Sequence, residues 1–103
     1  MSVEDFRINA FVRQVLSRFW IDAQSLRYGA VGRVVYLHGR FEKLRVPDPH
    51  DPDHAQHAGW VQEDRALLET VEKEIRREST VQDVVFRLEN FRKRDGKWVA
   101  SGV

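Results

Sequence analysis

The spacing of apolar residues changes along this chain, and these changes constrain its fold more than any other feature. Over residues 3–20 apolar side chains recur at helical spacing, which predicts one amphipathic helix with a single buried face. Over residues 25–41 the spacing becomes two, which predicts strands. A second helical pattern covers residues 61–78, and the spacing of two returns after Thr80. The chain therefore combines helices with strands.

Local turn signals divide these patterns into elements. Gly32 lies between two strand-like runs and can adopt the positive φ of a tight reversal, which predicts a β-hairpin. The dipeptide Asp95-Gly96 predicts a second hairpin, with a last strand over residues 97–100. Ser2, followed three residues later by Asp5, is typical of a helix start.

The predicted order is helix, strand, strand, helix, strand, strand. We therefore expect an α+β two-layer sandwich in which two helices cover one face of a three- or four-stranded, mostly antiparallel sheet. The second strand is expected to turn Val35, Leu37 and Phe41 toward the helices. The opposite face of the second helix is expected to be solvated, because it carries the i,i+4 pairs Glu69–Lys73 and Glu72–Arg76.

Length and composition limit the classes of protein that fit. A chain of 103 residues favours one domain over residues 1–103. Its 17 basic and 16 acidic residues argue against a surface built wholly for nucleic acid. The absence of cysteine excludes disulfides and sulfur-ligated zinc. No apolar run approaches the roughly 20 residues of a membrane span, and no secretory signal is evident, so we expect a cytoplasmic protein.

Residues 46–59 contain all three prolines and three of the four histidines, which predicts an irregular loop. Imidazole and carboxylate groups bind zinc, nickel or copper, so a metal-loaded sensor is one hypothesis for this loop. A hydrated loop is the favoured interpretation, because a proline-rich segment offers no groups to orient metal ligands. We therefore expect no cofactor. The candidate ligands would be His50, His54 and His57, with Asp48, Asp51 and Asp53.

The segments GRVVYLHGRF and VQDVVFRLENF resemble the strands of a BON domain, a small bacterial αββαβ module. The resemblance covers about residues 6–91 and implies a non-catalytic accessory module for phospholipid surfaces, proteins or small ligands. The chain departs from the family by its loop at 46–59, by Thr80 in place of a glycine, by its hairpin extension at 91–103 and by the absence of an export signal. The matching positions are Gly32, Val35, Leu37, Gly39, Phe41, Val81 and Val84.

If both helices cover one face of the sheet, the other face is open and mixes aromatic, apolar and basic side chains. Such a face can receive a partner protein or stack bases. The predicted second hairpin is basic, and its cations can contact phosphates or, as we favour, protect a sheet edge from pairing with other sheets. These basic residues are Arg92, Lys93, Arg94 and Lys97. The expected outer face comprises Arg27, Val34, Tyr36, His38, Arg40, Val85, Arg87 and Phe91. From both regions we predict as binding residues Tyr36, His38, Arg40, Arg87, Phe91, Arg92, Lys93 and Arg94.

The sequence favours a non-catalytic binding module that engages a protein partner or an anionic phospholipid surface, with self-association as a further option. Nucleic-acid binding by the same surface is the alternative. An enzyme is not expected, because no serine lies in a nucleophile elbow and His38 on a strand is typically a cross-strand neighbour. The GxxG pattern at 29–32 resembles a KH loop, but a hairpin turn explains it better.

Overall fold

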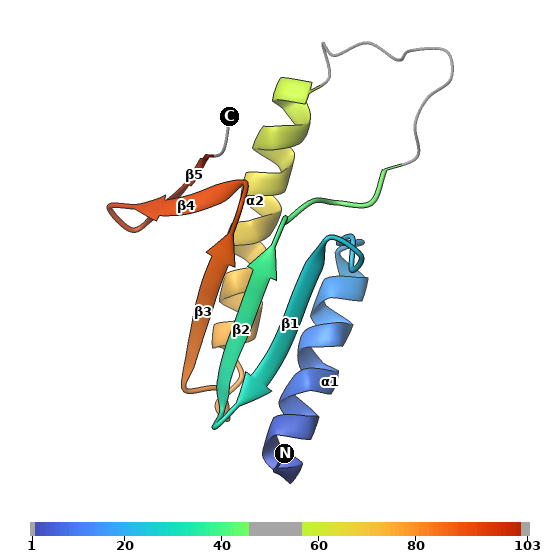
Figure 1. The fold of residues 1–103 in the computed structure, drawn as a ribbon, viewed down its shortest axis with the longest axis vertical. Coiled ribbons are helices and arrows are strands. Elements are labelled where there is room, and N and C mark those ends of the chain that lie inside the picture. The colour runs from blue at the N-terminus through green and yellow to red at the C-terminus, as the bar shows by residue number, and fades with distance from the viewer. Residues whose placement is uncertain (1, 46–56, 102–103) are drawn as a thin grey trace.

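The computed structural model describes residues 2–45 and 57–101, and it has the predicted α+β fold (Figure 1). The order of elements is the predicted one up to the second helix, but in the described residues three strands follow that helix instead of two, because the strand expected after it is interrupted at Glu89 and Asn90. In chain order the elements are α1 (Val3–Arg18), β1 (Leu26–Val31), β2 (Val34–Gly39), α2 (His57–Arg76), β3 (Asp83–Leu88), β4 (Phe91–Arg94) and β5 (Lys97–Ala100).

The strands form two separate sheets. Strands β1, β2 and β3 lie side by side in that order, and β4 and β5 form a two-stranded sheet of their own. The β1–β2 and β4–β5 pairs are antiparallel, as expected of strands joined by tight turns. The β2–β3 pair is parallel, because α2 carries the chain back to the starting end of the sheet.

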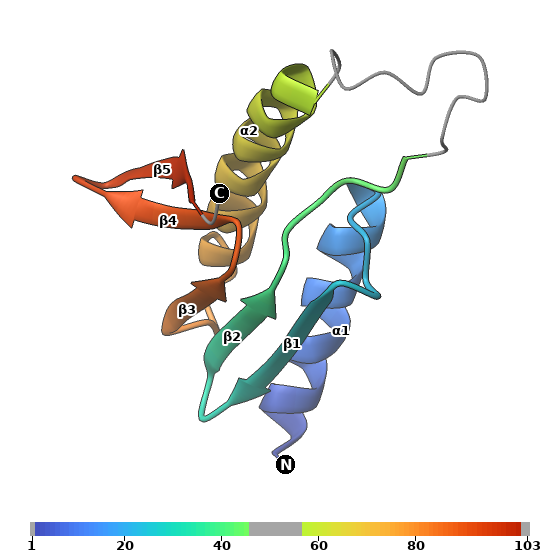
Figure 2. The same ribbon diagram turned by 45° about the horizontal axis from the view of Figure 1, so that its top comes forward.

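Both helices cover the same face of the three-stranded sheet (Figures 1 and 2). The core between the layers takes apolar side chains from each helix and from the inward positions of β2. The predicted inward residues of the second strand and its extension are therefore confirmed. Fully buried members of this core include Val12, Val15, Val35, Leu37, Phe41, Leu68, Val71 and Ile75.

Helix α2 begins earlier and ends earlier than its apolar spacing predicts. It covers His57–Arg76 instead of 61–78, so the predicted loop at 46–59 overlaps its first turn. The last proline is Pro52, and nothing after it prevents helical hydrogen bonding. Residues 46–56 lie outside the described residues.

A buried aspartate joins the start of α1 to the β1–β2 turn. Ser2 Oγ accepts a hydrogen bond from the Asp5 N–H at 3.0 Å, which confirms the predicted helix start. The Asp5 carboxylate accepts from the N–H groups of Gly32 at 3.1 Å and Arg33 at 2.9 Å. Both turn residues have positive φ, 58° and 66°, as a two-residue type I′ turn requires. The hydrogen bond from the Arg33 N–H is the main reason that the pKa of Asp5 is lowered.

Replacing Asp5 by asparagine is expected to lower the melting temperature at neutral pH. It should also reduce the amount by which the melting temperature falls when the pH is lowered. A carboxylate whose pKa is lower in the folded chain stabilises the fold above its unfolded pKa of about 4, and this contribution disappears as the pH falls through the folded value. Thermal unfolding of both proteins at a series of pH values between about 2 and 7 gives the melting temperature as a function of pH. Asp95→Asn in the exposed β4–β5 turn is the control and should leave the curve unchanged.

Helix α1 ends in a Schellman motif with a tryptophan at the position that favours glycine. The Trp20 N–H donates to the Ser17 carbonyl at 3.1 Å, and the Ile21 N–H donates to the Leu16 carbonyl at 3.0 Å. Trp20 has a φ of 59°, and its side chain is 67% exposed. A bulky residue in this left-handed region is strained by roughly 1 kcal/mol. The mostly exposed ring recovers little of this energy through packing.

Trp20→Gly is therefore expected to stabilise the protein by about 0.5–1 kcal/mol, because glycine adopts the positive φ without strain. Trp20→Ala is the matched variant: it removes the same ring but keeps the strain, and it should not stabilise. Chemical denaturation gives both free energies of unfolding. Equal destabilisation by the two variants would mean that the ring packs more strongly than its exposure indicates.

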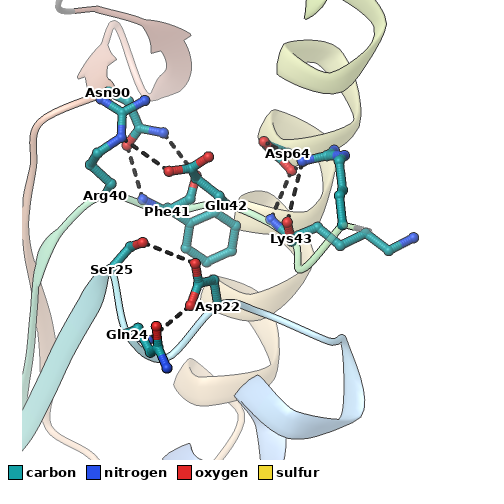
Figure 3. A network of polar contacts seen from close by, with 10 residues as sticks. Asp22, Gln24, Ser25, Arg40, Phe41, Glu42, Lys43, Asp64 and Asn90 are labelled. Atoms are coloured by element: carbon teal, nitrogen blue, oxygen red, sulfur yellow. Dashed lines mark hydrogen bonds and ion pairs between the residues drawn. The ribbon is translucent and has the colours of Figure 1, made fainter. Parts of the chain in front are cut away.

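Two residues bring the chain close together where the sheet ends. Gly39 has a φ of 112°, and a Cβ there would lie 2.4 Å from the Ser25 carbonyl oxygen, so only glycine fits. Beyond it, the Asn90 side chain accepts from the Phe41 N–H at 3.0 Å and donates to the Phe41 carbonyl at 2.8 Å (Figure 3). Asn90 thus pairs with Phe41 as a strand backbone would. The chain bends here and carries the β4–β5 hairpin toward α2.

Candidate binding surface

The face of the three-stranded sheet turned away from the helices presents three cross-strand rows. Its outward positions follow from the strand registers, because alternate residues point to opposite faces. The rows are Arg27–His38–Arg87, Gly29–Tyr36–Val85 and Val31–Val34–Asp83.

The first row is basic. Arg27 and Arg87 lie on either side of His38, and all three side chains are exposed. Because neighbouring strands are about 4.8 Å apart, the two arginines start from backbone positions about 10 Å apart. Neither guanidinium forms an ion pair or hydrogen bond with another described residue. One carboxylate or phosphate placed over His38 can therefore meet both arginines.

Tyr36 lies at the centre of the face. Its side chain is 42% exposed, which is high for an aromatic residue in a central strand. Its neighbour on β1 is Gly29, which has no side chain to cover the ring, and its neighbour on β3 is the half-buried Val85. The ring is thus open to a partner on the β1 side.

The third row is mainly apolar. Val31 is exposed and Val34 is half-buried. Asp83 accepts from the Val84 N–H at 2.8 Å and pairs with Arg76 at 3.3 Å. The Val84 hydrogen bond, followed by the Arg76 bond, lowers the pKa of Asp83. Asp83 is therefore occupied by its own neighbours, and the face changes from basic to apolar along the strands.

Phe91 does not belong to this face, so the prediction that places it on the outer face of the sheet is wrong. Its side chain is only 3% exposed and packs in the core. The prediction continued the spacing of two past Leu88, whereas the chain bends at Glu89 and Asn90. This bend turns Phe91 inward.

The basic hairpin is attached to α2 through a buried glutamate. Glu72 accepts from Lys93 Nζ at 2.6 Å, from Arg76 Nε at 3.0 Å and from the indole N–H of Trp98 at 3.0 Å. Glu72 is only 8% exposed, so the expectation that it lies on a solvated face is wrong. The expected i,i+4 pair of Glu72 with Arg76 does form, at 3.0 Å, whereas Glu69 pairs with Arg65 at 3.3 Å instead of with Lys73.

The ammonium group of Lys93 is therefore bound within the protein, to Glu72. Its ammonium group also lies 5.2 Å from the centre of the Trp98 ring, a cation–π contact. Burial raises the pKa of Glu72, but the hydrogen bonds from Lys93, Arg76 and Trp98 together outweigh burial, so the pKa is lowered. The carboxylate stays charged at neutral pH and neutralises Lys93.

Glu72→Gln is expected to destabilise the protein by about 1–2 kcal/mol. Breaking a fully buried ion pair costs about 3–5 kcal/mol, but Lys93 and Arg76 are 40% and 43% exposed and can regain water. Glu74→Gln is the control, because its partners Arg18 and Arg77 are exposed, and it should cost less than about 0.5 kcal/mol. Urea denaturation measures both, and equal losses would contradict a structural role specific to Glu72.

The remaining predicted binding residues separate into near and distant positions. Arg92 lines a hollow of about 300 Å³ together with Arg87, so it extends the basic row beyond β3. Arg40 is exposed just past β2 and pairs with Glu42 at 3.1 Å. Arg94 is exposed beside the β4–β5 turn. The structure thus brings together Tyr36, His38, Arg87 and Arg92, and it adds Arg27, which the spacing of two had placed on this face.

A second cavity, of about 420 Å³, lies between α2, the segment after β2 and the end of β5. Its charged groups are paired. Arg45 binds Asp64 at 2.9 Å and stacks 5.0 Å from the Trp60 ring centre. The buried Asp64 also accepts from the Lys43 N–H at 3.1 Å (Figure 3). This network fastens the segment after β2 to α2.

The structure does not test the metal hypothesis. His50 and His54 lie outside the described residues, as do the three loop aspartates, and His57 is the first residue of α2. In residues 2–45 and 57–101, no three histidine or acidic side chains are grouped to hold a metal ion.

No family model matches this chain, and no curated protein matches it. The resemblance to the BON family therefore stays a prediction. Neither helix, over its described residues, combines the length and the apolar character needed to traverse a bilayer.

Proposed function

We propose that this protein is a non-catalytic binding module, of the BON type that its sequence resembles, and that it engages a protein partner bearing acidic side chains. The surface is the outer face of β1, β2 and β3. The proposal is carried by one observation: the exposed Tyr36 lies next to a row in which Arg27 and Arg87 have no partner among the described residues.

The residue types on this face favour protein over lipid. Arginine and tyrosine dominate the energetically important positions of protein interfaces, whereas lysine is depleted there. The outward positions of the three strands include two arginines, a histidine and a tyrosine, and no lysine. A lipid surface instead selects clusters of about four to eight lysines or arginines, together with bulky apolar groups that enter the bilayer, whereas these outward positions carry only two arginines.

The size of the face predicts weak binding. Three strands of six residues span about 14 Å by 20 Å, or roughly 300 Å², which is less than half of the ~800 Å² per partner of a stable complex. Arg92 and the hollow beside β3 enlarge the contact only moderately. We therefore expect a transient complex whose affinity falls as salt rises.

The test titrates the isotope-labelled protein with three probes and follows its backbone amides by NMR. The probes are a glutamate-rich peptide, vesicles of phosphatidylcholine with phosphatidylglycerol, and single-stranded oligouridine. We expect the peptide to shift the amides around Arg27, Tyr36 and Arg87. The double variant Arg27→Glu/Arg87→Glu should weaken peptide binding at least about tenfold, because two charge contacts are reversed.

The control is Arg7→Glu/Arg13→Glu, which changes the net charge equally but alters exposed residues of α1. It should bind the peptide nearly as the unmodified protein does. Stronger binding of vesicles or oligouridine at the same face would replace the acidic protein partner by lipid or nucleic acid. Peptide shifts confined to α1 would contradict the proposed surface.

A further inference from the structure

The outer edge of β3 has backbone groups that point away from the sheet. In the parallel β2–β3 register Gly39 pairs with Leu88, and the Glu89 N–H donates to the Gly39 carbonyl at 2.7 Å. The backbone groups of Val85 and Arg87 therefore point toward β2. Those of residues 84, 86 and 88 point to the other side, where β3 has no neighbouring strand among the described elements.

One end of this edge is closed by side chains. The Val84 N–H donates to Asp83 Oδ1 at 2.8 Å, and the Val84 carbonyl accepts from Arg76 at 3.4 Å. These bonds prevent pairing at Val84, as edge strands commonly require. No such side chain covers the edge-facing N–H and C=O groups of Phe86 and Leu88 in the described part of the chain.

The open stretch borders the hollow between β3 and the β4–β5 hairpin. Phe86 and Leu88 are half-buried and line this hollow together with Trp98 and Arg92. The Phe86 and Trp98 rings meet edge to face, with centres 4.9 Å apart, and form an apolar floor. The hollow, of about 300 Å³, has room for a small apolar side chain.

The charges beside the open edge of β3 indicate which kind of extended segment from a partner could pair with it. A residue paired with Arg87 on an added strand would point to the outer face, about 5 Å from the arginine side chain at Cβ. The neighbouring residues of that strand would point into the hollow. Arg87, which has no ion-pair partner among the described residues, and the exposed Arg92 therefore favour acidic residues alternating with small apolar ones.

We infer that the acidic partner binds by adding a short extended strand to the open edge of β3, with its backbone paired to Phe86 and Leu88. This inference rests on the proposed function and gives its mode of recognition. Backbone pairing supplies affinity, and the alternation of acidic and apolar side chains supplies specificity. It also enlarges the small outer face by one strand.

The test uses an eight-residue peptide of alternating glutamate and valine, capped at both ends, and two N-methylated forms of it. One form carries N-methyl groups on the backbone nitrogens of the valines, and the other carries them on those of the glutamates. Methylation of the strand edge that meets β3 removes its donors, so one form should bind at least tenfold more weakly. The other form should bind within about twofold of the parent, because its methyl groups face solvent.

Hydrogen exchange of the complete protein gives the second measurement. The Phe86 and Leu88 amides should exchange at least tenfold more slowly when the peptide is bound, whereas the Val84 amide, already bonded to Asp83, should change little. Strand addition would be overturned if the peptide shifts the amide resonances around Tyr36 but leaves the Phe86 and Leu88 amides unprotected. It would also be overturned if the two methylation patterns have equal effects. Either result would leave the proposed function standing. If the peptide binds neither around Tyr36 nor at Phe86 and Leu88, both the strand addition and the proposed function are wrong.

Discussion

The structure depends on burial of one apolar layer between two helices and a single face of the sheet. Inward side chains of β2 such as Val35 and Leu37 are fully buried against residues of both helices, including Val12 and Leu68. With about 100 residues the chain can build one such layer and little more. No helix among the described residues therefore covers the opposite face of the sheet. The proposed binding surface is a direct consequence of this one-sided packing.

Buried carboxylates fasten the outlying segments to this layer. Asp5 holds the β1–β2 turn to α1, Asp64 holds the segment after β2 to α2, and Glu72 holds the β4–β5 hairpin to α2. Each carboxylate accepts hydrogen bonds from backbone amides or from charged and indole donors, which makes its burial tolerable. The three acids thus position parts of the chain that contribute few apolar side chains to the core.

The hairpin links the packing to the proposed recognition. Asn90 bends the chain after β3, and Trp98 and Glu72 hold the hairpin against α2. The hairpin therefore does not continue the three-stranded sheet as a fourth strand, and no other strand in the described part of the chain pairs with the edge of β3 at Phe86 and Leu88. The same bend places Arg92 beside Arg87. Basic residues from two sheets meet at one edge as a result.

The amino-acid sequence alone predicted both helices, the β1–β2 hairpin and the inward and outward positions of β2, because spacings of 3.6 and 2 are local properties of helices and strands. It also placed Tyr36, His38 and Arg87 on one exposed face. It did not predict that β3 and β4 are separate strands, because the bend between them depends on a contact with a distant segment. It could not indicate that Phe91 turns inward, because this depends on the long-range pair between Asn90 and Phe41. It could not show that Glu72 is buried either, since the i,i+4 spacing to Arg76 is the same on a solvated helix. Both features follow from long-range packing, because the groups that bury Glu72 and that leave the β3 edge without a paired strand in the described residues come from segments far apart in the chain.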